Sequence, residues 1–423
     1  MSTSRREFLQ TGFLATAALS CGKDTTAEAS KTQALLAERY ALLDEALNRP
    51  VLRRELFPEP ILIESCELLQ QGQNYLCRVR ASTGAVGYSI SNNYQMRYLY
   101  PIATQRVNPF FIGKDARDLE QLLEEVYVYR SNYKLQSLAL WVPVATVEFA
   151  ILDLLGQIAG EPIGKLLARA IHHPTIAVYQ ANNYRGQSAE ASLAQIVATA
   201  ESTGARAVKF KLGGRMSQGE HPSGRSEALI PMVRAAFGEE MTIYADANGS
   251  YEVEEAIRIG RLMEAHNYDF YEEPVAFDDY EGTRQVAAAL DIPIAGGEQE
   301  PSLRNFRWLL ANEALQIVQP DIFYFGGMVR SLRVARMAAV MGLECVPHIS
   351  GSGLGWFYMM HFCSALPNAG PFHEFKGFQD DIDYHCATSD LQLQNGTIKV
   401  PTGPGLGLDF DPDFLAGFTA IST

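Results

Sequence analysis

Three acidic residues stand at equal intervals along the chain, and this spacing restricts the folds that the chain can adopt. Asp246, Glu272 and Glu298 are 26 residues apart twice over (272 − 246 = 26; 298 − 272 = 26), and each closes a short apolar or β-branched run. Such an interval accommodates one strand, one helix and two loops. In a barrel of parallel strands, consecutive strand ends crowd one rim, where three carboxylates can converge on one divalent cation. The spacing therefore predicts a Mg²⁺ site on a barrel.

Length and charge set limits on this interpretation. A chain of 423 residues suits a barrel of about 250 residues plus a second unit. The formal net charge of −14 gives no basic face, which argues against nucleic acid or anionic lipid as the partner. It does not exclude an anionic substrate, because a bound cation and lysines reverse the local charge in a pocket.

Residues 1–24 have the features of an export signal. Ser4 to Leu9 resembles the twin-arginine motif, and Gly12 to Leu19 forms a short apolar run that is too short to span a bilayer. This predicts export to the periplasm. Cys21 follows a small residue, as in a bacterial lipobox, so a lipid anchor on Cys21 is one alternative. A disordered N-terminus on a cytoplasmic protein is the other.

The rest of the chain divides by pattern into four regions. Residues 25–55 are predicted to form a helical linker, and residues 56–170 a small antiparallel sheet followed by helices, one of which could end at Gly156. Residues 171–390 alternate strands with helices. Residues 391–423 are predicted to be sheet and loop that return to the region 56–170.

Strands are predicted at seven places in the third region: Ile176–Ala181, Ala207–Lys211, Met241–Asp246, Phe270–Glu272, Ile292–Glu298, Ile317–Asp321 and Leu343–His348. Amphipathic helical stretches lie between them. Strands and helices alternating at this interval imply a parallel sheet, and seven or eight in series favour closure into a barrel.

Lys209 and Lys211 lie two positions apart in one predicted strand, so both side chains face the barrel interior. Two close ammonium groups repel each other, and a nearby Mg²⁺ adds to that repulsion. Both effects disfavour the charged form, so one lysine is predicted to act as a neutral general base. Two exposed lysines on an edge strand are the alternative.

Asp321 and His348 end two further predicted strands and are 27 residues apart (348 − 321 = 27). An aspartate hydrogen-bonded to imidazole fixes its tautomer and stabilises the imidazolium. The pair therefore predicts a second base on the other face of the substrate, with a purely structural histidine as the alternative.

Taken together, these motifs resemble the enolase superfamily, in particular its mandelate racemase-like subgroup. The matching pieces occur in order: Lys209-x-Lys211, Asp246-Ala-Asn248, Glu272-Glu273-Pro274, Gly297-Glu298, Pro320-Asp321 and His348. The resemblance extends from about residue 60 to the C-terminus. It implies an α/β fold: a modified (β/α)₇β barrel with an N-terminal α+β capping domain and an active site between the two.

The resemblance also implies roles for individual residues. The expected Mg²⁺ ligands are Asp246, Glu272 and Glu298. The expected bases are Lys211 and His348, with Asp321 orienting the histidine. Lys209 would hold the substrate carboxylate and Asn248 would contact the substrate or the metal shell, whereas Glu273 is not expected to be a ligand. Glu374 is the candidate for an acidic residue on the last strand, with an ordinary rim carboxylate as the alternative.

These residues predict chemistry at a carbon next to a carboxylate. Removing an α-proton requires strong stabilisation of the enediolate, which Mg²⁺ and a lysine provide. We expect β-elimination of water from an acid sugar, a small-molecule carboxylate, by a dehydratase. The alternative is a racemase or epimerase of a 2-hydroxy acid or amino acid derivative, and a minor alternative is a non-catalytic sugar-acid binding protein. The resemblance also implies a homo-oligomer.

Three further features leave alternatives open. The segment from Asn92 to Tyr100, with Tyr94, Arg97 and Tyr98, is either a substrate-contacting lid or a surface loop. His221, Arg225 and Trp356 are additional candidates for substrate contacts. Cys66 and Cys77 lie on neighbouring predicted strands, and the sequence does not decide whether they form a disulfide.

Overall fold

The computed structural model describes residues 24–350, 354–376 and 384–421. The predicted twin-arginine motif and Cys21 lie outside these residues. The chain divides into two units between Ala41 and Leu42. The helix α2 (Asp24–Leu47) crosses this division, and its last turns belong to the second unit, where Leu43 and Ala46 are fully buried. A 3₁₀ turn, η1 (Arg54–Leu56), follows it.

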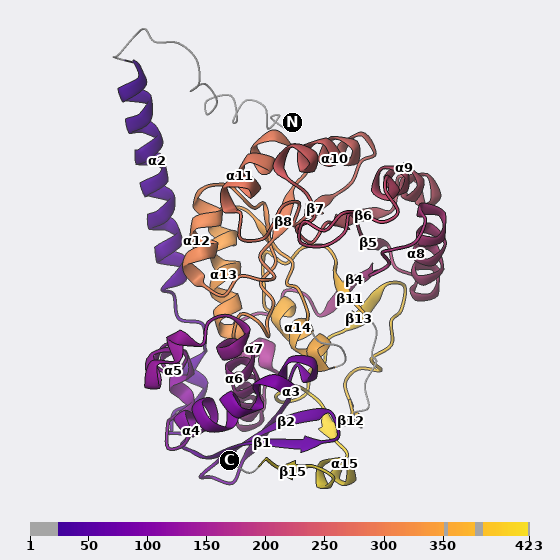
Figure 1. Ribbon diagram of the computed structural model, residues 1–423. Helices are drawn as coiled ribbons and strands as arrows, with labels where there is room; N and C mark the ends of the chain where they lie inside the picture. The colour runs from indigo at the N-terminus through magenta and orange to yellow at the C-terminus, as the bar shows by residue number, and fades with distance from the viewer. Residues whose placement is uncertain (1–23, 351–353, 377–383, 422–423) are drawn as a thin grey trace. The chain divides into compact units, whose positions relative to one another are not determined.

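A four-stranded antiparallel sheet begins the second unit. It contains β1 (Ile63–Gln71), β2 (Asn74–Ala81) and β3 (Val86–Ile90) in chain order. The fourth strand, β15 (Thr419–Ala420), comes from the far end of the chain and pairs with the outer edge of β1, Leu69 opposite Ala420. Figure 1 shows the yellow C-terminal residues beside the indigo β1–β2 hairpin.

Five helices follow this sheet: α3 (Asn93–Ile102), α4 (Asn108–Phe111), α5 (Leu119–Val128), α6 (Leu138–Ala159) and α7 (Ile163–Leu167). α6 is long and apolar enough to cross a membrane, but most of that stretch is buried inside the protein, as in the core helix of a globular fold.

The end of α6 differs from the prediction. The helix continues past Gly156 and ends at Gly160, whose φ of 66° gives the left-handed cap that favours glycine. Gly156 instead allows close packing, because a Cβ there would lie 2.5 Å from Cα of Gly405.

Eight parallel strands form the barrel: β4 (Thr175–Ala181), β5 (Ala207–Lys211), β6 (Thr242–Asp246), β7 (Phe270–Glu272), β8 (Ile294–Gly296), β9 (Ile317–Val318), β10 (Glu344–Cys345) and β11 (His373–Phe375). Their order is β10-β9-β8-β7-β6-β5-β4-β11. A parallel bridge between Cys345 and Ala369 joins β10 to the segment leading into β11, which closes the ring.

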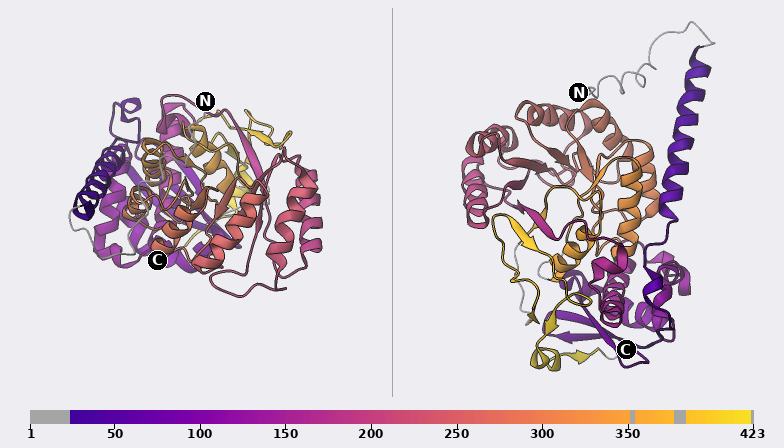
Figure 2. Two further views of the ribbon diagram at one scale, coloured as in Figure 1. Left: turned by 90° about the horizontal axis from the view of Figure 1, so that it is seen from above. Right: turned by 180° about the vertical axis from the view of Figure 1, so that it is seen from behind.

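Each of the first seven strands is followed by a helix: α8 (Ala189–Thr203), α9 (Arg225–Phe237), α10 (Val253–Ala265), α11 (Tyr280–Ala289), α12 (Leu303–Ala311), α13 (Met328–Val340) and α14 (Leu354–Ser364). Figures 1 and 2 show helices around the outside of the strands. The expected (β/α)₇β barrel is confirmed.

The last described strands pair with the barrel sheet and with the N-terminal sheet, and two of them form a small sheet of their own. β13 (Thr397–Lys399) pairs antiparallel with β4, and β12 (Tyr384–His385) pairs with β14 (Asp409–Phe410). The short helix α15 (Pro412–Ala416) then leads to β15.

Strand alternation divides the barrel residues between two apolar clusters. Val208 and Phe210 point outward and pack with Leu229 and other helix residues in one cluster. Ala207 points inward and belongs to a second cluster with Tyr244 and other residues of the barrel interior. Because side chains alternate along a strand, Lys209 and Lys211 also point inward, above this apolar floor.

Three predicted strands are shorter than expected at their C-terminal ends. β8, β9 and β10 stop before Glu298, Asp321 and His348, which therefore lie in loops just past the strands. Local chain chemistry explains the early ends. Gly297 has a φ of 110°, which ends extended backbone, and proline precedes both Asp321 and His348 and has no N–H for the strand ladder.

Cys66 and Cys77 are free thiols in this structure, and both are buried. They lie on β1 and β2, but Cys66 stands opposite Val79 and Cys77 opposite Leu68. A hydrogen bond with Cys77, together with burial, raises the pKa of the Cys66 thiol.

Candidate active site

Three neighbouring strands hold one side of the site. Lys211 on β5 stands opposite Asp246 on β6, and Asp246 stands opposite Glu272 on β7. The Lys209 Nζ lies 2.9 Å and 2.7 Å from the two carboxylate oxygens of Glu272, and Lys211 donates to Oδ2 of Asp246. We call these four residues the lysine side.

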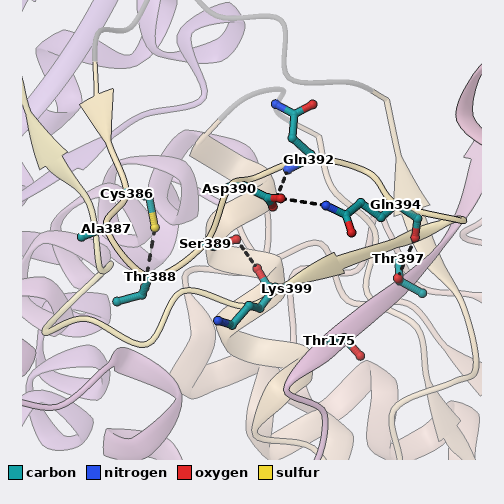
Figure 3. A pocket seen from close by; sticks show the side chains of 10 residues that line it. All are labelled: Thr175, Cys386, Ala387, Thr388, Ser389, Asp390, Gln392, Gln394, Thr397 and Lys399. Atoms are coloured by element: carbon teal, nitrogen blue, oxygen red, sulfur yellow. Dashed lines mark hydrogen bonds between the residues drawn. The ribbon is translucent and has the colours of Figure 1, made fainter.

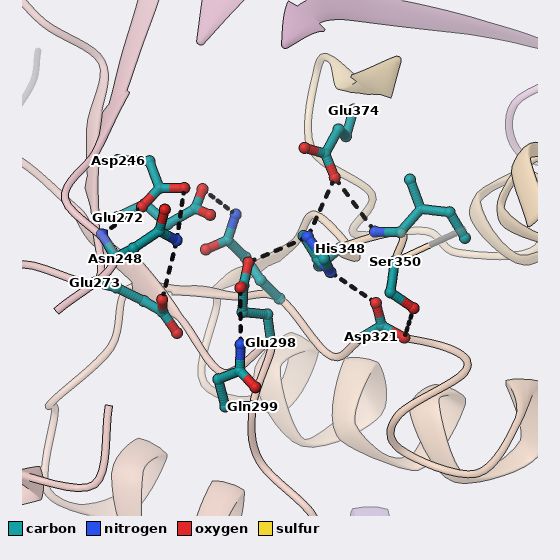
Figure 4. A network of polar contacts seen from close by, with 12 residues as sticks. Asp246, Asn248, Glu272, Glu273, Glu298, Gln299, Asp321, His348, Ser350 and Glu374 are labelled. Carbon is teal, nitrogen blue, oxygen red and sulfur yellow. Dashed lines mark hydrogen bonds and ion pairs between the residues drawn. The ribbon is translucent and has the colours of Figure 1, made fainter. Parts of the chain in front are cut away.

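The three equally spaced carboxylates converge. Oxygens of Asp246, Glu272 and Glu298 all lie within 4.8 Å of one another, and all three residues are buried (Figure 4). Gln319 Nε2 donates to Glu272 Oε2 at 2.8 Å, and Gln299 Nε2 donates to Glu298 Oε1 at 3.0 Å. A buried set of three carboxylates offers the oxygen ligands that hard divalent cations take, so the triad fits a metal site.

Buried carboxylates are crowded at this site, and burial and crowding raise the pKa of two of them. Burial raises the pKa of Glu272 to about 7, and the neighbouring Asp246 adds to this effect although Lys209 opposes it. Burial and the carboxylates of Glu298, Asp246 and Glu272 raise the pKa of Glu273 well above its ordinary value. A cation bound among these carboxylates would favour their ionised forms.

Lys209, which the resemblance assigned to binding the substrate carboxylate, is held in its charged form. Burial acts to lower the pKa of this lysine, but Glu272 and other neighbouring groups raise it well above the ordinary value. At Lys209, attraction to the nearby carboxylates therefore outweighs the repulsion between the two ammonium groups that the sequence suggested.

The histidine side faces the lysine side across the triad, and consists of Asp321, His348 and Glu374. His348 Nδ1 lies 2.6 Å from Asp321 Oδ2, while its Nε2 lies 3.2 Å from Glu298 Oε2 and 3.6 Å from Glu374 Oε2 (Figure 4). Burial lowers the pKa of His348, but Glu298 and Glu374, helped by the bond to Asp321, raise it overall.

Glu374 lies on β11 and is 2% exposed. Its carboxylate lies 3.3 Å from Lys376 Nζ and 3.7 Å from Lys209 Nζ, and it accepts a bond from the Ile349 N–H. Burial acts to raise the pKa of Glu374, but Lys376, Lys209 and His348 hold it well below its ordinary range. Its low pKa favours the ionised form, and its contacts link His348 of the histidine side to Lys209 of the lysine side.

Asn248 lies next to the triad, where its Nδ2 is 3.2 Å from Asp246 Oδ2. Its Oδ1 accepts a bond of 2.8 Å from Arg185 Nη2, a residue that the sequence analysis missed. Arg185 lies four residues past the end of β4, so the rule that strand ends carry functional groups would have found it. A guanidinium at this point gives the site a cation besides the lysines.

The structure places the other candidates for substrate contact at separate positions. Tyr94 and Tyr98 are both 67% exposed, and the Arg97 guanidinium lies over both rings, at 4.3 Å and 4.6 Å from their centroids. Arg225 is buried and donates to the carbonyls of Lys211 and Tyr184, so it holds the end of β5. Trp356 packs against Phe375, and His221 is exposed.

The loop that carries Asp321 packs against α6. Glu148, fully buried on α6, accepts a bond of 2.8 Å from the N–H of Val329 in the first turn of α13. Gly327, with a φ of 107°, lies so close that a Cβ there would be 2.5 Å from the Glu148 carboxyl carbon. The ring of Phe149, the next residue on α6, meets Phe323 edge to face at 5.2 Å.

A polar cavity of about 530 Å³ lies away from these residues, at the opposite end of β4 (Figure 3). Thr175, the first residue of β4, contributes to its lining together with residues between 386 and 399. Its polar groups bond to one another, for example Gln394 Nε2 to Asp390 Oδ2 at 2.7 Å. The site therefore lies at the carboxyl ends of the strands and not at this cavity.

Comparison with known proteins gives consistent matches. Residues 191–414 match the family model described as enolase C-terminal domain-like, which is more than half of the chain. The chain is 28% identical over 331 residues to arabinonate dehydratase of Saccharolobus solfataricus, covering 78% of this chain and 86% of that enzyme. It is 27% identical over 323 residues to D-galactarolactone cycloisomerase of Agrobacterium fabrum, covering 74% and 83% of the two chains.

A similar solved structure is the mandelate racemase/muconate lactonizing protein of Paracoccus denitrificans PD1222 complexed with magnesium. It superposes with a TM-score of 0.75 at 26% identity, covering 86% of this chain and 99% of that one. The match therefore includes both the barrel and most of the N-terminal elements.

Proposed function

The chain belongs to the enolase C-terminal domain-like family, and from this premise we propose that it is a Mg²⁺-dependent acid-sugar dehydratase. The observation that carries the proposal is the placement of Lys211 and His348 on opposite sides of a buried carboxylate triad. Two proton-transfer groups on opposite sides can remove a proton from one face of a substrate and protonate a leaving group on the other.

The chain's own residues account for each part of such a reaction. Asp246, Glu272 and Glu298 would hold Mg²⁺, which when bound supplies positive charge that stabilises the substrate carboxylate as its α-proton is lost. Lys209 and Arg185 add fixed positive charge that helps to bind an anionic, polyhydroxylated substrate.

The proton transfers then divide between the two sides. In the direction that begins with lysine, neutral Lys211 takes the α-proton, and the electron pair of the C–H bond passes into the carboxylate group. This pair returns to form a C=C bond as the β-C–O bond breaks. The imidazolium of His348 gives its Nε2 proton to the departing hydroxyl, which leaves as water, and the enol becomes a 2-keto-3-deoxy acid. Exchanging the roles of Lys211 and His348 gives the same product from the opposite α-configuration.

An isomerase is the second candidate, supported by a relative named as a cycloisomerase and by a neighbour named for mandelate racemase. The same two bases would then act in turn, one removing the α-proton and the other returning a proton to carbon. No loss of water would occur.

Proton NMR in D₂O separates these functions. The purified protein is incubated with Mg²⁺ and a panel of mono- and diacid sugars, with the Lys211→Ala/His348→Ala double variant as the control. A 2-keto-3-deoxy product identifies a dehydratase, and α-deuteration without elimination identifies a racemase or epimerase. If both single variants, Lys211→Ala and His348→Ala, exchange the α-proton as fast as the wild type, the assignment of the bases is wrong.

We also propose that the protein is exported by the twin-arginine route, on the basis of residues 4–21. The test is fractionation of cells that express the full chain or an Arg5→Lys/Arg6→Lys variant. Retention of only the variant in the cytoplasm supports export, and equal cytoplasmic retention of both contradicts it. Labelling with a radioactive fatty acid, with Cys21→Ala as control, tests the lipid anchor.

A further inference from the structure

A hydrogen-bonded chain leads from the N-terminal elements to the histidine side. Asn92, 3% exposed, immediately precedes α3, and its side chain makes two different bonds. Its Oδ1 accepts a bond from the Gln95 N–H at 3.2 Å, which caps the helix. Its Nδ2 donates to the Ser350 Oγ at 2.9 Å, on the loop that follows β10. The second bond is not needed for capping.

Ser350 in turn forms a hydrogen bond with Asp321. Its hydroxyl donates to Asp321 Oδ1 at 3.1 Å. A serine hydroxyl has one proton and accepts through its lone pairs, while an ionised carboxylate only accepts. Because the amide of Asn92 donates to Ser350, the single proton of the serine is directed toward Asp321.

Asp321 is then bonded at both oxygens. Oδ1 also accepts from the N–H groups of Phe323 and Tyr324, each at 2.8 Å, and Oδ2 binds His348 Nδ1. These bonds fix the plane of the carboxylate, and the carboxylate in turn fixes the ring and tautomer of His348. Asn92 is therefore three hydrogen bonds away from the proposed base.

We propose that Asn92 is a positioning residue that orients His348 through Ser350 and Asp321, so that the docked position of α3 determines whether the base is correctly aligned. The kinetic part of this inference rests on the proposed function. Its structural part concerns only the orientation of His348 and can be measured without turnover.

Asn92→Asp is the variant that tests the bond to Ser350 most directly. It keeps the oxygen that caps α3 but replaces the amide donor by an acceptor, so the Ser350 hydroxyl turns toward residue 92 and away from Asp321. Asn93→Asp is the matched control, because Asn93 makes the same kind of bond to the Tyr75 N–H but none to Ser350. Asn92→Ser, which also caps a helix, replaces Asn92→Asp if that variant does not fold.

The first measurement is NMR of protein with ¹⁵N-labelled histidine, with and without Mg²⁺, assigning His348 by comparison with His348→Gln. We expect the His348 Nδ1–H signal to shift alike in Asn92→Asp and Ser350→Ala, and no further in the double variant. The His361 signal should stay constant, because His361 bonds to the Leu406 carbonyl elsewhere in the fold. An unchanged His348 signal in Asn92→Asp, or additive shifts in the double variant, would overturn the proposal.

The second measurement is kinetic and uses an acid that the wild type converts. Asn92→Asp should lower kcat about 10- to 100-fold in the step that uses His348, with KM changed less than about twofold. Exchange catalysed by Lys211 should stay at the wild-type rate, and so should both steps in Asn93→Asp. Equal slowing of both steps would overturn the proposal. If the wild type converts no acid, the proposed function fails while the NMR result still decides the role of Asn92.

Discussion

The lysine side and the histidine side of the site are held in place by different means. Lys209, Lys211, Asp246 and Glu272 lie within strands, and main-chain pairing between β5, β6 and β7 sets their register. In the histidine side, Asp321 and His348 lie past the ends of β9 and β10, as Glu298 lies past the end of β8, and their positions depend on side-chain bonds and on α6 and α3. Glu374, its third residue, lies within β11. The first arrangement is fixed by local geometry, whereas the second depends on packing between distant segments.

The carboxylate triad joins both sides, so its loss should have the largest effect. We expect Asp246→Asn to abolish tight Mg²⁺ binding and to lower activity on the order of 10³-fold, because the charge of the substrate carboxylate is no longer stabilised. Isothermal titration with Mg²⁺ and turnover assays measure the two effects. Glu273→Gln is the control and should still bind the cation. Equal loss of binding in Glu273→Gln would show that the ligand set is wrong.

Removal of one base should separate the two sides. Lys211→Ala and His348→Ala are each expected to lower turnover about 10²- to 10⁴-fold, which is the usual contribution of a general acid or base. With a pair of α-epimeric substrates, each variant should keep deuterium exchange on the face served by its remaining base. Loss of exchange on both faces in either single variant would mean that the two sides do not act separately.

Replacing a residue that supports the histidine side should slow catalysis more than replacing one that supports the lysine side. We expect Asp321→Asn to slow the His348 step about 10²-fold, because the tautomer of His348 is no longer fixed. Arg225→Gln removes the bonds to Lys211 and Tyr184, yet strand pairing remains, so the Lys211 step should change less than about threefold while stability falls by about 1–3 kcal/mol. Exchange rates measure the kinetic effects, and urea unfolding measures the change in stability. A larger kinetic loss in Arg225→Gln than in Asp321→Asn would contradict the comparison.

The smallest expected effect is a pH dependence of stability from α6. Burial raises the pKa of Glu148 to about 8, above the ordinary value of 4.5, although N–H groups at the start of α13 partly oppose this. The folded state therefore binds this proton more tightly than the unfolded state. Its stabilising contribution is fully present below about pH 4.5 and is lost as the pH rises through about 8.

Urea unfolding at pH 6 and pH 9 tests this dependence. The wild type should lose on the order of a few kcal/mol more than Glu148→Gln between the two values, because glutamine does not titrate. Identical pH dependence in the two proteins would contradict the assignment to Glu148.

The lysine side could be predicted from the sequence because a strand repeats every two residues. That period alone places Lys209 and Lys211 on one face, and equal spacing brings Asp246 next to Glu272. The positions of Asp321 and His348 at successive strand ends were also predictable, but the exact ends of those strands, which proline shortens, were not.

The supporting residues could not be predicted in this way. Asn92 and Ser350 are 258 residues apart, and Glu148 and Val329 are 181 apart. No local pattern relates such pairs, since their contact arises only when α3 and α6 pack on the barrel. The predicted end of α6 failed for a similar reason: Gly156 is required by the backbone of Gly405 and not by the helix itself.

The pairing of β15 with β1 has a consequence for biosynthesis. Thr419 and Gln70, which this pairing joins, are 349 residues apart, so nearly the whole chain must leave the ribosome before the edge of β1 is covered. Until then, the nascent chain carries an open strand edge that can pair with a neighbouring copy. Slow translation or termination before β15 should therefore favour aggregation over folding.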